Sequence, residues 1–264
     1  MRREGKGTPL LLVHGYPTAS WDWVEIWPSL VQRFDTIALD MLGFGFSEKP
    51  QGHRYSIFEQ ADLHMALLMR LGIEQFDLLV HDYGVTVGQE LLARHADGQL
   101  PGLRSIAFLN GGLFPETHRA RLIQKALASP IGPLLAQLSS RRTFARSMRA
   151  VFGPRTQPTE AQIDAFFELS SRDGGKLALA GLIRYIEERR LHRDRWVGAF
   201  VSSNVPMILV DGVLDPVSGG HMVARARELR PTLEIVELAV GHYPQVEDPE
   251  GVLTALHRFW DRTR

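Results

Sequence analysis

Short, mostly apolar runs recur along the chain and alternate with segments in which apolar residues return every three or four positions. The runs predict buried strands, and the spaced pattern predicts helices that pack on one face. Because helical segments separate most of the runs, the pattern predicts a mostly parallel sheet of about six strands, covered on both faces. The strands are expected at Leu10–Val13, Thr36–Leu39, Leu78–Val80, Ile106–Leu109, Met207–Val210 and Leu233–Leu238.

Four helices are predicted in the same alternation, at Trp23–Phe34, Ser56–Leu71, Val85–His95 and Val252–Trp260. The second has clear end signals: Ser56 can cap its first turn, Glu59 follows three residues later, and Gly72 stops it.

The strand–helix rhythm breaks between residues 113 and 199, where the pattern is helical and rich in arginine. We therefore expect a helical cap at 113–199, inserted into a core formed by residues 1–112 and 200–264. The cap segment holds 15 Lys and Arg against 8 Asp and Glu, a net charge of +7. A solvated helical surface accounts for this excess, and attraction of anionic ligands is the alternative.

Composition narrows the class of protein. The 264 residues are 44% hydrophobic and 23% charged, and the formal net charge is zero. A neutral chain gives no indication of nucleic-acid binding. The absence of cysteine excludes disulfides and fits the reducing cytoplasm. No apolar stretch approaches the roughly 20 residues that span a bilayer, so a soluble protein is expected.

Asp82 ends the third apolar run, in the stretch "LLVHDYGVTVG" at 78–88. A strand that turns directly into a helix lifts the residue at the turn clear of the sheet. The helix N-terminus favours an anion there, and Gly84 leaves room for the bend. Asp82 is therefore a candidate displayed carboxylate, although an ordinary N-cap aspartate would give the same pattern.

Two further polar residues follow the last two predicted strands. Asp215 lies in "DGVLDPV" and His242 in "VGHYPQVEDP". Alone, Asp215 could start a turn and His242 could be a satisfied loop histidine. Strand ends of a parallel sheet share one edge, so all three side chains are expected to meet as nucleophile, acid and base.

The first predicted strand runs into "HGYP" at 14–17. The backbone N–H groups of Tyr16 and Tyr83 are candidates for an oxyanion hole beside Asp82. His14 is expected to brace this loop, and His81 to point away from Asp82, because neighbours alternate along a strand. Scattered histidines offer no metal-ligand spacing, so neither metal nor cofactor is expected.

Nearly the whole chain from Leu10 onward resembles the α/β-hydrolase superfamily, in its aspartate-nucleophile branch. The resemblance rests on "DMLGFGFSEKP", "YSIFEQA", "HDYG", "NGGLFPETHR", "RWVGA" and "HYPQVEDP". The chain looks similar to epoxide hydrolases and to mesoderm-specific-transcript-like hydrolases. The resemblance implies an α/β-hydrolase fold with an inserted helical cap and no cofactor.

An aspartate nucleophile attacks saturated carbon and forms an ester, which water activated by His242 then hydrolyses. "HGYP" resembles the epoxide hydrolase pattern His-Gly-X-Pro. That family uses cap tyrosines to protonate the leaving oxygen, which implies Tyr185 in "GLIRYIEER"; amphipathic packing is the alternative for this residue. His118 is a candidate second cap donor. The expected reaction opens a mainly apolar epoxide to a vicinal diol.

Other functions stay open at this point. A haloalkane or haloacid dehalogenase is one, although Tyr83 and Tyr16 stand where the resemblance implies Trp and Asn halide donors. An esterase-like enzyme and a non-catalytic protein of the same fold are the others.

Two features depart from the family pattern. Val80 is bulky where a small residue is usual, which predicts a loosened or shifted turn at Asp82. The N-terminal hairpin looks shortened, which would leave the strand at Thr36–Leu39 as an open sheet edge. Open edges pair with other chains, so we expect a homodimer or an unstable monomer.

Overall fold

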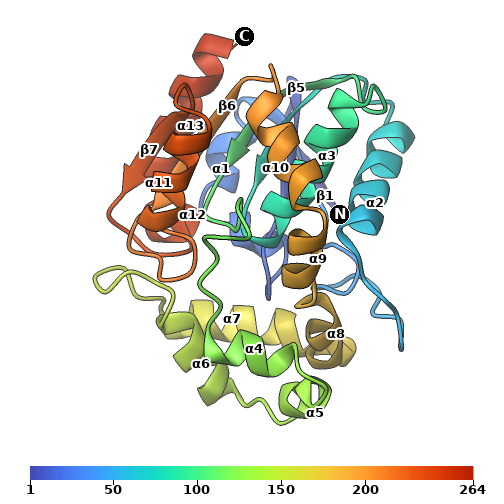
Figure 1. Ribbon diagram of the computed structural model, residues 1–264, viewed down its shortest axis with the longest axis vertical. Helices are drawn as coiled ribbons and strands as arrows, with labels where there is room; N and C mark the ends of the chain where they lie inside the picture. The colour runs from blue at the N-terminus through green and yellow to red at the C-terminus, as the bar shows by residue number, and fades with distance from the viewer. Residues whose placement is uncertain (264) are drawn as a thin grey trace.

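A single seven-stranded sheet organises the protein, for which the computed structural model describes residues 1–263 (Figure 1). The strand order is β1-β3-β2-β4-β5-β6-β7, and every neighbouring pair is parallel except β1 and β3. The mostly parallel α/β sheet is therefore confirmed. The strands are β1 (Arg2–Glu4), β2 (Thr8–Val13), β3 (Phe34–Ala38), β4 (Phe76–Val80), β5 (Leu103–Phe108), β6 (Met207–Gly212) and β7 (Glu234–Leu238).

The sequence prediction missed β1. This strand pairs antiparallel with β3, with Arg3 opposite Ile37, and so covers the edge that was expected to be open. Three consecutive charged residues give no apolar signal, and an edge strand exposed to solvent needs none. The reason given for a homodimer is therefore wrong.

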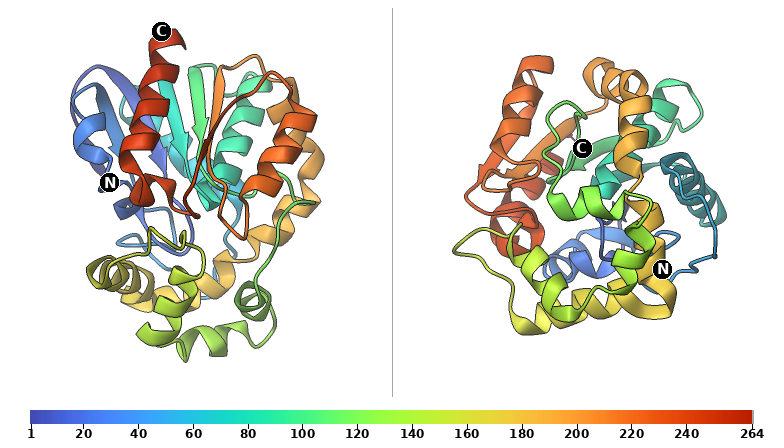
Figure 2. Two further views of the ribbon diagram at one scale, coloured as in Figure 1. Left: turned by 90° about the vertical axis from the view of Figure 1, so that its left-hand side faces the viewer. Right: turned by 60° about the horizontal axis from the view of Figure 1, so that its bottom comes forward.

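Helices cover both faces of the sheet, as Figure 2 shows. On one face, η1 (Ser20–Trp23), α1 (Trp27–Leu30) and α13 (Pro249–Thr263) pack on one set of alternate strand side chains. On the other, α2 (Ile57–Arg70), α3 (Tyr83–Ala96), α10 (Arg193–Ser202) and α11 (Gly220–Leu229) contribute to the second apolar layer. The short helix α12 (Pro244–Glu247) follows the loop after β7.

Three of the four predicted helices are confirmed. In α2, the Ser56 hydroxyl accepts the Glu59 N–H at 3.1 Å, as the capping pattern predicts. The helix predicted at Trp23–Phe34 is wrong, because only η1 and the single turn α1 form, and Phe34 begins β3. Trp23, Ile26, Trp27 and Leu30 are all buried, so two separate short turns gave an apolar spacing that resembles one longer helix.

Most of the segment 113–199 lies beyond the carboxyl edge of the sheet, at the lower end of Figure 1. It contains α4 (Leu122–Leu127), α5 (Gly132–Gln137), α6 (Arg141–Arg149), α7 (Glu160–Ser171), η2 (Arg172–Gly174), α8 (Gly175–Leu182) and α9 (Tyr185–Leu191). The following helix α10 instead packs along α3. The buried Glu90 carboxylate of α3 joins the two helices, because it accepts bonds from Arg195 at 2.7 Å and from the Trp196 indole at 2.8 Å.

Val80, just before the turn that follows β4, packs against Gly88 of α3. Its methyl groups lie where a side chain at position 88 would sit: a Cβ on Gly88 would be 3.0 Å from Val80 Cγ1. The helix therefore supplies the space that a small residue in the strand would otherwise leave. The expectation that Val80 loosens or shifts the turn stays a prediction.

Candidate active site

Asp82 stands in the sharp turn between β4 and α3. Its backbone has φ 47° and ψ −107°, a strained conformation for a residue with a side chain. The Asp82 N–H donates to the Asn110 carbonyl at 2.7 Å, and a Cβ on Gly84 would lie 2.2 Å from the Val13 carbonyl oxygen. The side chain makes no cap bond to α3. The turn therefore presents the carboxylate away from its own helix, and the N-cap alternative does not apply.

Three side chains predicted to meet do so at the carboxyl edge of the sheet. His242 Nδ1 lies 2.7 Å from Asp215 Oδ2, and His242 Nε2 lies 3.3 Å from Asp82 Oδ2. All three residues are at least 94% buried. The imidazole thus bridges two carboxylates, one held by the loop after β6 and the other by the turn after β4.

Asp215 is fixed by further donors. Its carboxylate accepts the Val217 N–H at 2.8 Å and the Ser218 hydroxyl at 2.7 Å. The Asn110 side-chain amide, which follows β5, donates to it at 3.2 Å. Asn110 thus holds Asp215 through its side chain and Asp82 through its carbonyl. The sequence analysis missed this residue, although its position directly after an apolar strand is the same signal that pointed to Asp82.

Burial and charge oppose one another in this cluster. Burial would raise the pKa of Asp82 and of Asp215, but the charge and hydrogen bonding of His242 bring both pKa values below the ordinary range. Burial would lower the pKa of His242, but the two carboxylates raise it well above the ordinary value. These shifts favour an imidazolium between two ionised carboxylates in the resting cluster.

A backbone donor faces the outer oxygen of Asp82. The Tyr16 N–H, in the loop after β2, donates to Asp82 Oδ1 at 2.8 Å. Tyr83 is the first residue of α3, so its N–H has no acceptor within the helix. The structure therefore brings Tyr16 to the carboxylate as predicted and leaves the Tyr83 N–H available at the same turn.

His14, predicted to brace its loop, and His81, predicted to point away from Asp82, both have hydrogen-bond partners on the backbone. His14 Nε2 accepts the Met41 N–H at 3.0 Å, so its Nδ1 carries the proton and donates to the Gly15 carbonyl at 2.9 Å. His81 turns away from Asp82, and its Nε2 lies 2.8 Å from the His242 carbonyl oxygen. Both rings hold loops of the site together.

Tyr185 begins α9 and is 3% exposed. Its ring packs on Tyr83 with ring centroids 4.6 Å apart. Burial, and then the neighbouring Asp82 carboxylate, raise the pKa of the Tyr185 hydroxyl, which therefore keeps its proton at neutral pH. The hydroxyl is thus a neutral donor beside the carboxylate.

His118 lies on the same side, in the loop after β5. Its Nδ1 is 3.3 Å from Arg189 Nη2, and its Nε2 is buried without a hydrogen-bond partner among residues 1–263. Burial and the Arg189 charge lower the pKa of His118 to about 3, so the ring is neutral. Because a guanidinium only donates, His118 Nδ1 accepts and the proton sits on Nε2.

Arg189 is a second residue that the sequence analysis missed. It is 2% exposed, and within the described chain no carboxylate lies within 4.0 Å of its guanidinium. It donates to the Gly112 carbonyl at 2.8 Å and lies 4.8 Å from the centroid of the Tyr185 ring. A Cβ on Gly112 would be 1.3 Å from Arg189 Nη1, so this approach requires glycine. A buried cation without a carboxylate is costly, which indicates a function.

A cavity of about 460 Å³ lies between the sheet edge and the helical segment, and Asp82, His242 and Tyr16 form part of its wall. Tyr185 and His118 are not among the residues that line it. Most of the remaining wall is apolar, and its larger side chains are Ile123, Leu127, Leu135, Leu138, Phe144, Met148, Val151, Phe167, Leu179, Val217 and Tyr243. The cavity therefore suits a small, mainly apolar molecule.

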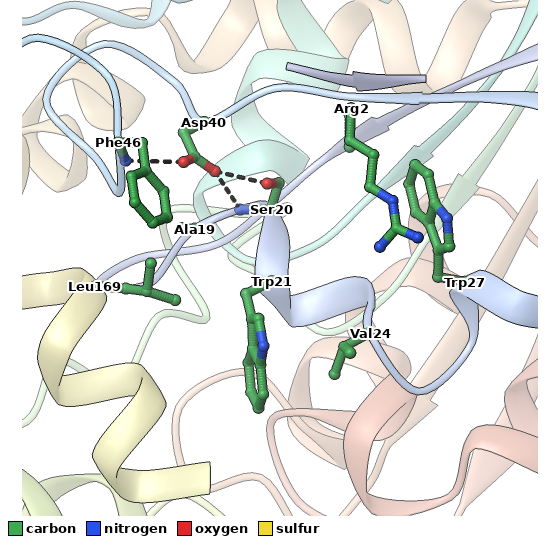
Figure 3. A pocket seen from close by; sticks show the side chains of 10 residues that line it. Arg2, Ala19, Ser20, Trp21, Val24, Trp27, Asp40, Phe46 and Leu169 are labelled. Atoms are coloured by element: carbon green, nitrogen blue, oxygen red, sulfur yellow. Dashed lines mark hydrogen bonds between the residues drawn. The ribbon is translucent and has the colours of Figure 1, made fainter. Parts of the chain in front are cut away.

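A second cavity, of about 180 Å³, lies near β1 and η1 (Figure 3). Its one carboxylate, Asp40, accepts the Ser20 N–H at 2.8 Å, the Ser20 hydroxyl at 2.6 Å and the Phe46 N–H at 2.8 Å. These bonds hold Asp40 in a structural role. The larger cavity is therefore the candidate active site.

The fold and this site define a class of protein. Residues 8–249 match the family model described as "alpha/beta hydrolase fold". The chain belongs to the α/β-hydrolase fold family.

One relative is similar in sequence over almost the whole chain. The mesoderm-specific transcript protein of Mus musculus is 42% identical over 265 residues, which cover 96% of this chain and 79% of that protein.

Two solved structures share the fold. The haloalkane dehalogenase DatA from Agrobacterium tumefaciens superposes with a TM-score of 0.84 at 21% identity, over 99% of this chain and 92% of that one. The epoxide hydrolase CorEH superposes with a TM-score of 0.77 at 20% identity, over 99% and 94%. Within residues 1–263, no helix has both the length and the apolar composition needed to cross a bilayer.

Proposed function

We propose that the protein is a cofactor-independent epoxide hydrolase that opens an epoxide to a vicinal diol through an ester on Asp82. The observation that carries this proposal is the cluster in which His242 bridges Asp215 and a cavity-lining Asp82 held away from its helix. A carboxylate in that position attacks a carbon atom, and the imidazole behind it activates water.

In the first step, an Asp82 carboxylate oxygen attacks one epoxide carbon and the carbon–oxygen bond of the ring breaks. The leaving oxygen takes the Tyr185 hydroxyl proton. The imidazolium of His242 then returns a proton to Tyr185, which leaves a neutral imidazole. This transfer is favoured because ester formation removes one of the two negative charges that raise the pKa of His242.

In the second step, water attacks the ester carbonyl carbon and gives a proton to His242 Nε2. Asp215 holds the imidazole in the required orientation through Nδ1. The negative charge that develops on oxygen is stabilised by the Tyr16 N–H, with the Tyr83 N–H as the second donor. Collapse releases the diol, and the proton of the new carboxyl group passes to the departing oxygen, so the resting charges are restored.

The donors for ring opening form a connected group. Arg189 contacts both Tyr185 and His118, and its bond to His118 Nδ1 leaves the Nε2 proton free to donate. We assign Tyr185 as the proton donor and His118 as a second donor that steadies the developing alkoxide. In this assignment, Arg189 orients both side chains.

The test is a single turnover of styrene oxide in heavy-oxygen water. If Asp82 is the nucleophile, the heavy isotope enters the Asp82 carboxylate, and mass spectrometry of its peptide detects it there. Label in the diol with none in the peptide would mean direct attack by water. Asp82→Asn should abolish diol formation while keeping the fold.

Asp211→Asn is the matched control. Burial raises the pKa of the Asp211 carboxyl well above its ordinary value, which favours the neutral form, and the amide of asparagine has nearly the same shape. The control should keep its activity.

A dehalogenase uses the same nucleophile, so the substrate panel should include haloalkanes and haloacids beside epoxides and p-nitrophenyl esters. Halide release that exceeds diol formation would favour that alternative. Ester cleavage alone, insensitive to Asp82→Asn, would favour an esterase-like reaction.

Two expectations about the protein's setting also remain proposals. The absence of cysteine favours a cytoplasmic location. A homodimer is tested by size-exclusion chromatography at high concentration, where a stable monomer would reject it.

A further inference from the structure

Residues 117–159 of the helical segment have an unusual composition. Between residues 117 and 159 there is no aspartate or glutamate, whereas Arg119, Arg121, Lys125, Arg141, Arg142, Arg146, Arg149 and Arg155 supply eight cations. This stretch contains α4, α5 and α6, which lie together at the end of the molecule opposite the C-terminus in Figure 1.

Large apolar side chains on this stretch face solvent. Leu122 is 84% exposed, Ile131 60%, Leu134 58% and Leu138 72%. Ile131, Leu134 and Leu138 recur at helical spacing along α5, so they form one stripe. Because α5 has no charged residue, nothing on the helix itself covers this stripe. A contiguous exposed apolar surface of this kind is a sign of an interaction site.

Part of the positive charge on the same stretch is unneutralised. Arg141 and Arg149 pair with Glu160 of α7. Arg142 and Arg146 line a shallow depression on α6, and within residues 1–263 neither has a carboxylate within 4.0 Å. The stretch therefore combines exposed apolar side chains on α5 with free cations on α6, which is the composition that binds an anionic bilayer rather than a neutral partner.

The inner side of the same helices is the wall of the active-site cavity. Arg121, Ile123 and Leu127 of the α4 region and Thr143 of α6 line it, and Leu138, although largely exposed, borders it as well. A face docked on a bilayer would thus lie directly above the cavity that holds Asp82.

We propose that the face formed by α4, α5 and α6 docks on the surface of an anionic lipid bilayer, with the α5 stripe inserted among the headgroups and Arg142 and Arg146 against the phosphates. This proposal goes beyond the hydrolase chemistry and does not depend on it. The anionic headgroups would neutralise the net positive charge of the helical segment. The wall of the cavity would then lie at the bilayer, in which apolar molecules concentrate.

Vesicle co-sedimentation tests this without any substrate. The full chain is mixed with vesicles of phosphatidylcholine alone or with about one-third phosphatidylserine. Binding should require phosphatidylserine and weaken as salt is raised, because exposed charges are screened.

Two double variants separate the contributions. Arg142→Gln with Arg146→Gln should weaken binding about thirtyfold, since each cation near an anionic surface contributes about 1 kcal/mol. Leu134→Ser with Leu138→Ser should weaken it roughly tenfold and leave the salt dependence in place.

The matched control is Met69→Ser with Arg70→Gln, an exposed apolar and cationic pair on α2. The control should bind as the parent does. Failure to bind phosphatidylserine vesicles would overturn the proposal, as would an equal loss in the control. Self-association that disappears in the Leu134 and Leu138 variant, without vesicle binding, would mean that a second copy covers the stripe.

Discussion

Replacement of Arg189 should lower kcat and leave the stability of the fold nearly unchanged. In Arg189→Met, the side chain keeps much of its apolar stem but loses the cation that lies 4.8 Å from the Tyr185 ring centroid and 3.3 Å from His118 Nδ1. The two proposed donors then lose the group that orients them, and His118 is free to place its proton on either nitrogen.

The magnitude follows from those contacts. A desolvated cation–π contact contributes about 2 kcal/mol, and loss of that amount in the transition state lowers kcat about thirtyfold. Stability should change little. The Gly112 carbonyl loses its donor, but removal of a buried charge that has no carboxylate partner offsets that loss.

The assay compares kcat, KM and thermal unfolding of Arg189→Met, Arg189→Lys and Arg190→Met. Arg190 is the exposed neighbour on α9 and serves as the control. Nitrogen NMR of His118 should show the proton fixed on Nε2 in the parent and distributed over both nitrogens in Arg189→Met. A fall in Tm that matches the fall in kcat, with an unchanged His118 spectrum, would refute the orienting role and make Arg189 a packing residue.

Two other predictions concern pH and the α3–α10 contact. Because the pKa of Asp82 is lowered, the alkylation rate measured by stopped flow should stay level from about pH 5 to pH 8. The rate of ester hydrolysis should instead rise with pH as His242 loses its proton. If both rates changed with pH in the same way, the assigned charges of Asp82 and His242 would be wrong. Glu90→Gln should reduce the free energy of unfolding by about 2–3 kcal/mol through loss of the bonds from Arg195 and Trp196. Because the pKa of Glu90 is lowered in the folded protein, this stabilisation is present above the ordinary glutamate pKa and is lost as the pH falls through the folded-state pKa. The free energies of unfolding of parent and variant, measured with urea, should therefore become equal in acid and differ at neutral pH.

The fold could be predicted where a strand is buried on both faces. β2, β4 and β6 contain the continuous apolar runs Leu10–Val13, Leu78–Val80 and Met207–Val210, and such runs have few alternatives to a central parallel strand. β1 could not be found this way, since an edge strand is stabilised by backbone bonds to β3 and its side chains are charged. The segment around Trp23 misled for another reason, because the two short turns η1 and α1 bury side chains at helix-like spacing without joining into one helix.

The residues of the candidate site likewise include some that the sequence predicts and one that it does not. Asp82, Asp215 and His242 each follow an apolar strand, so the topology of a parallel sheet alone brings them to one edge. Arg189 lies in a helix beside Arg190, and nothing in the local pattern distinguishes the buried guanidinium from the exposed one. Its position depends on the missing side chain of Gly112, which is distant in the sequence and is revealed only by the packing.

The fit of Val80 against Gly88 ties two positions on different elements into one unit. The side chain of Val80 fills the space that the absent side chain of Gly88 leaves, so neither residue can be replaced freely by itself. A shorter residue at 80 leaves a void under the turn, and a longer one at 88 pushes the helix outward and carries Asp82 with it. Engineering of this elbow should therefore exchange both residues together, with the bulk moved from one side of the contact to the other.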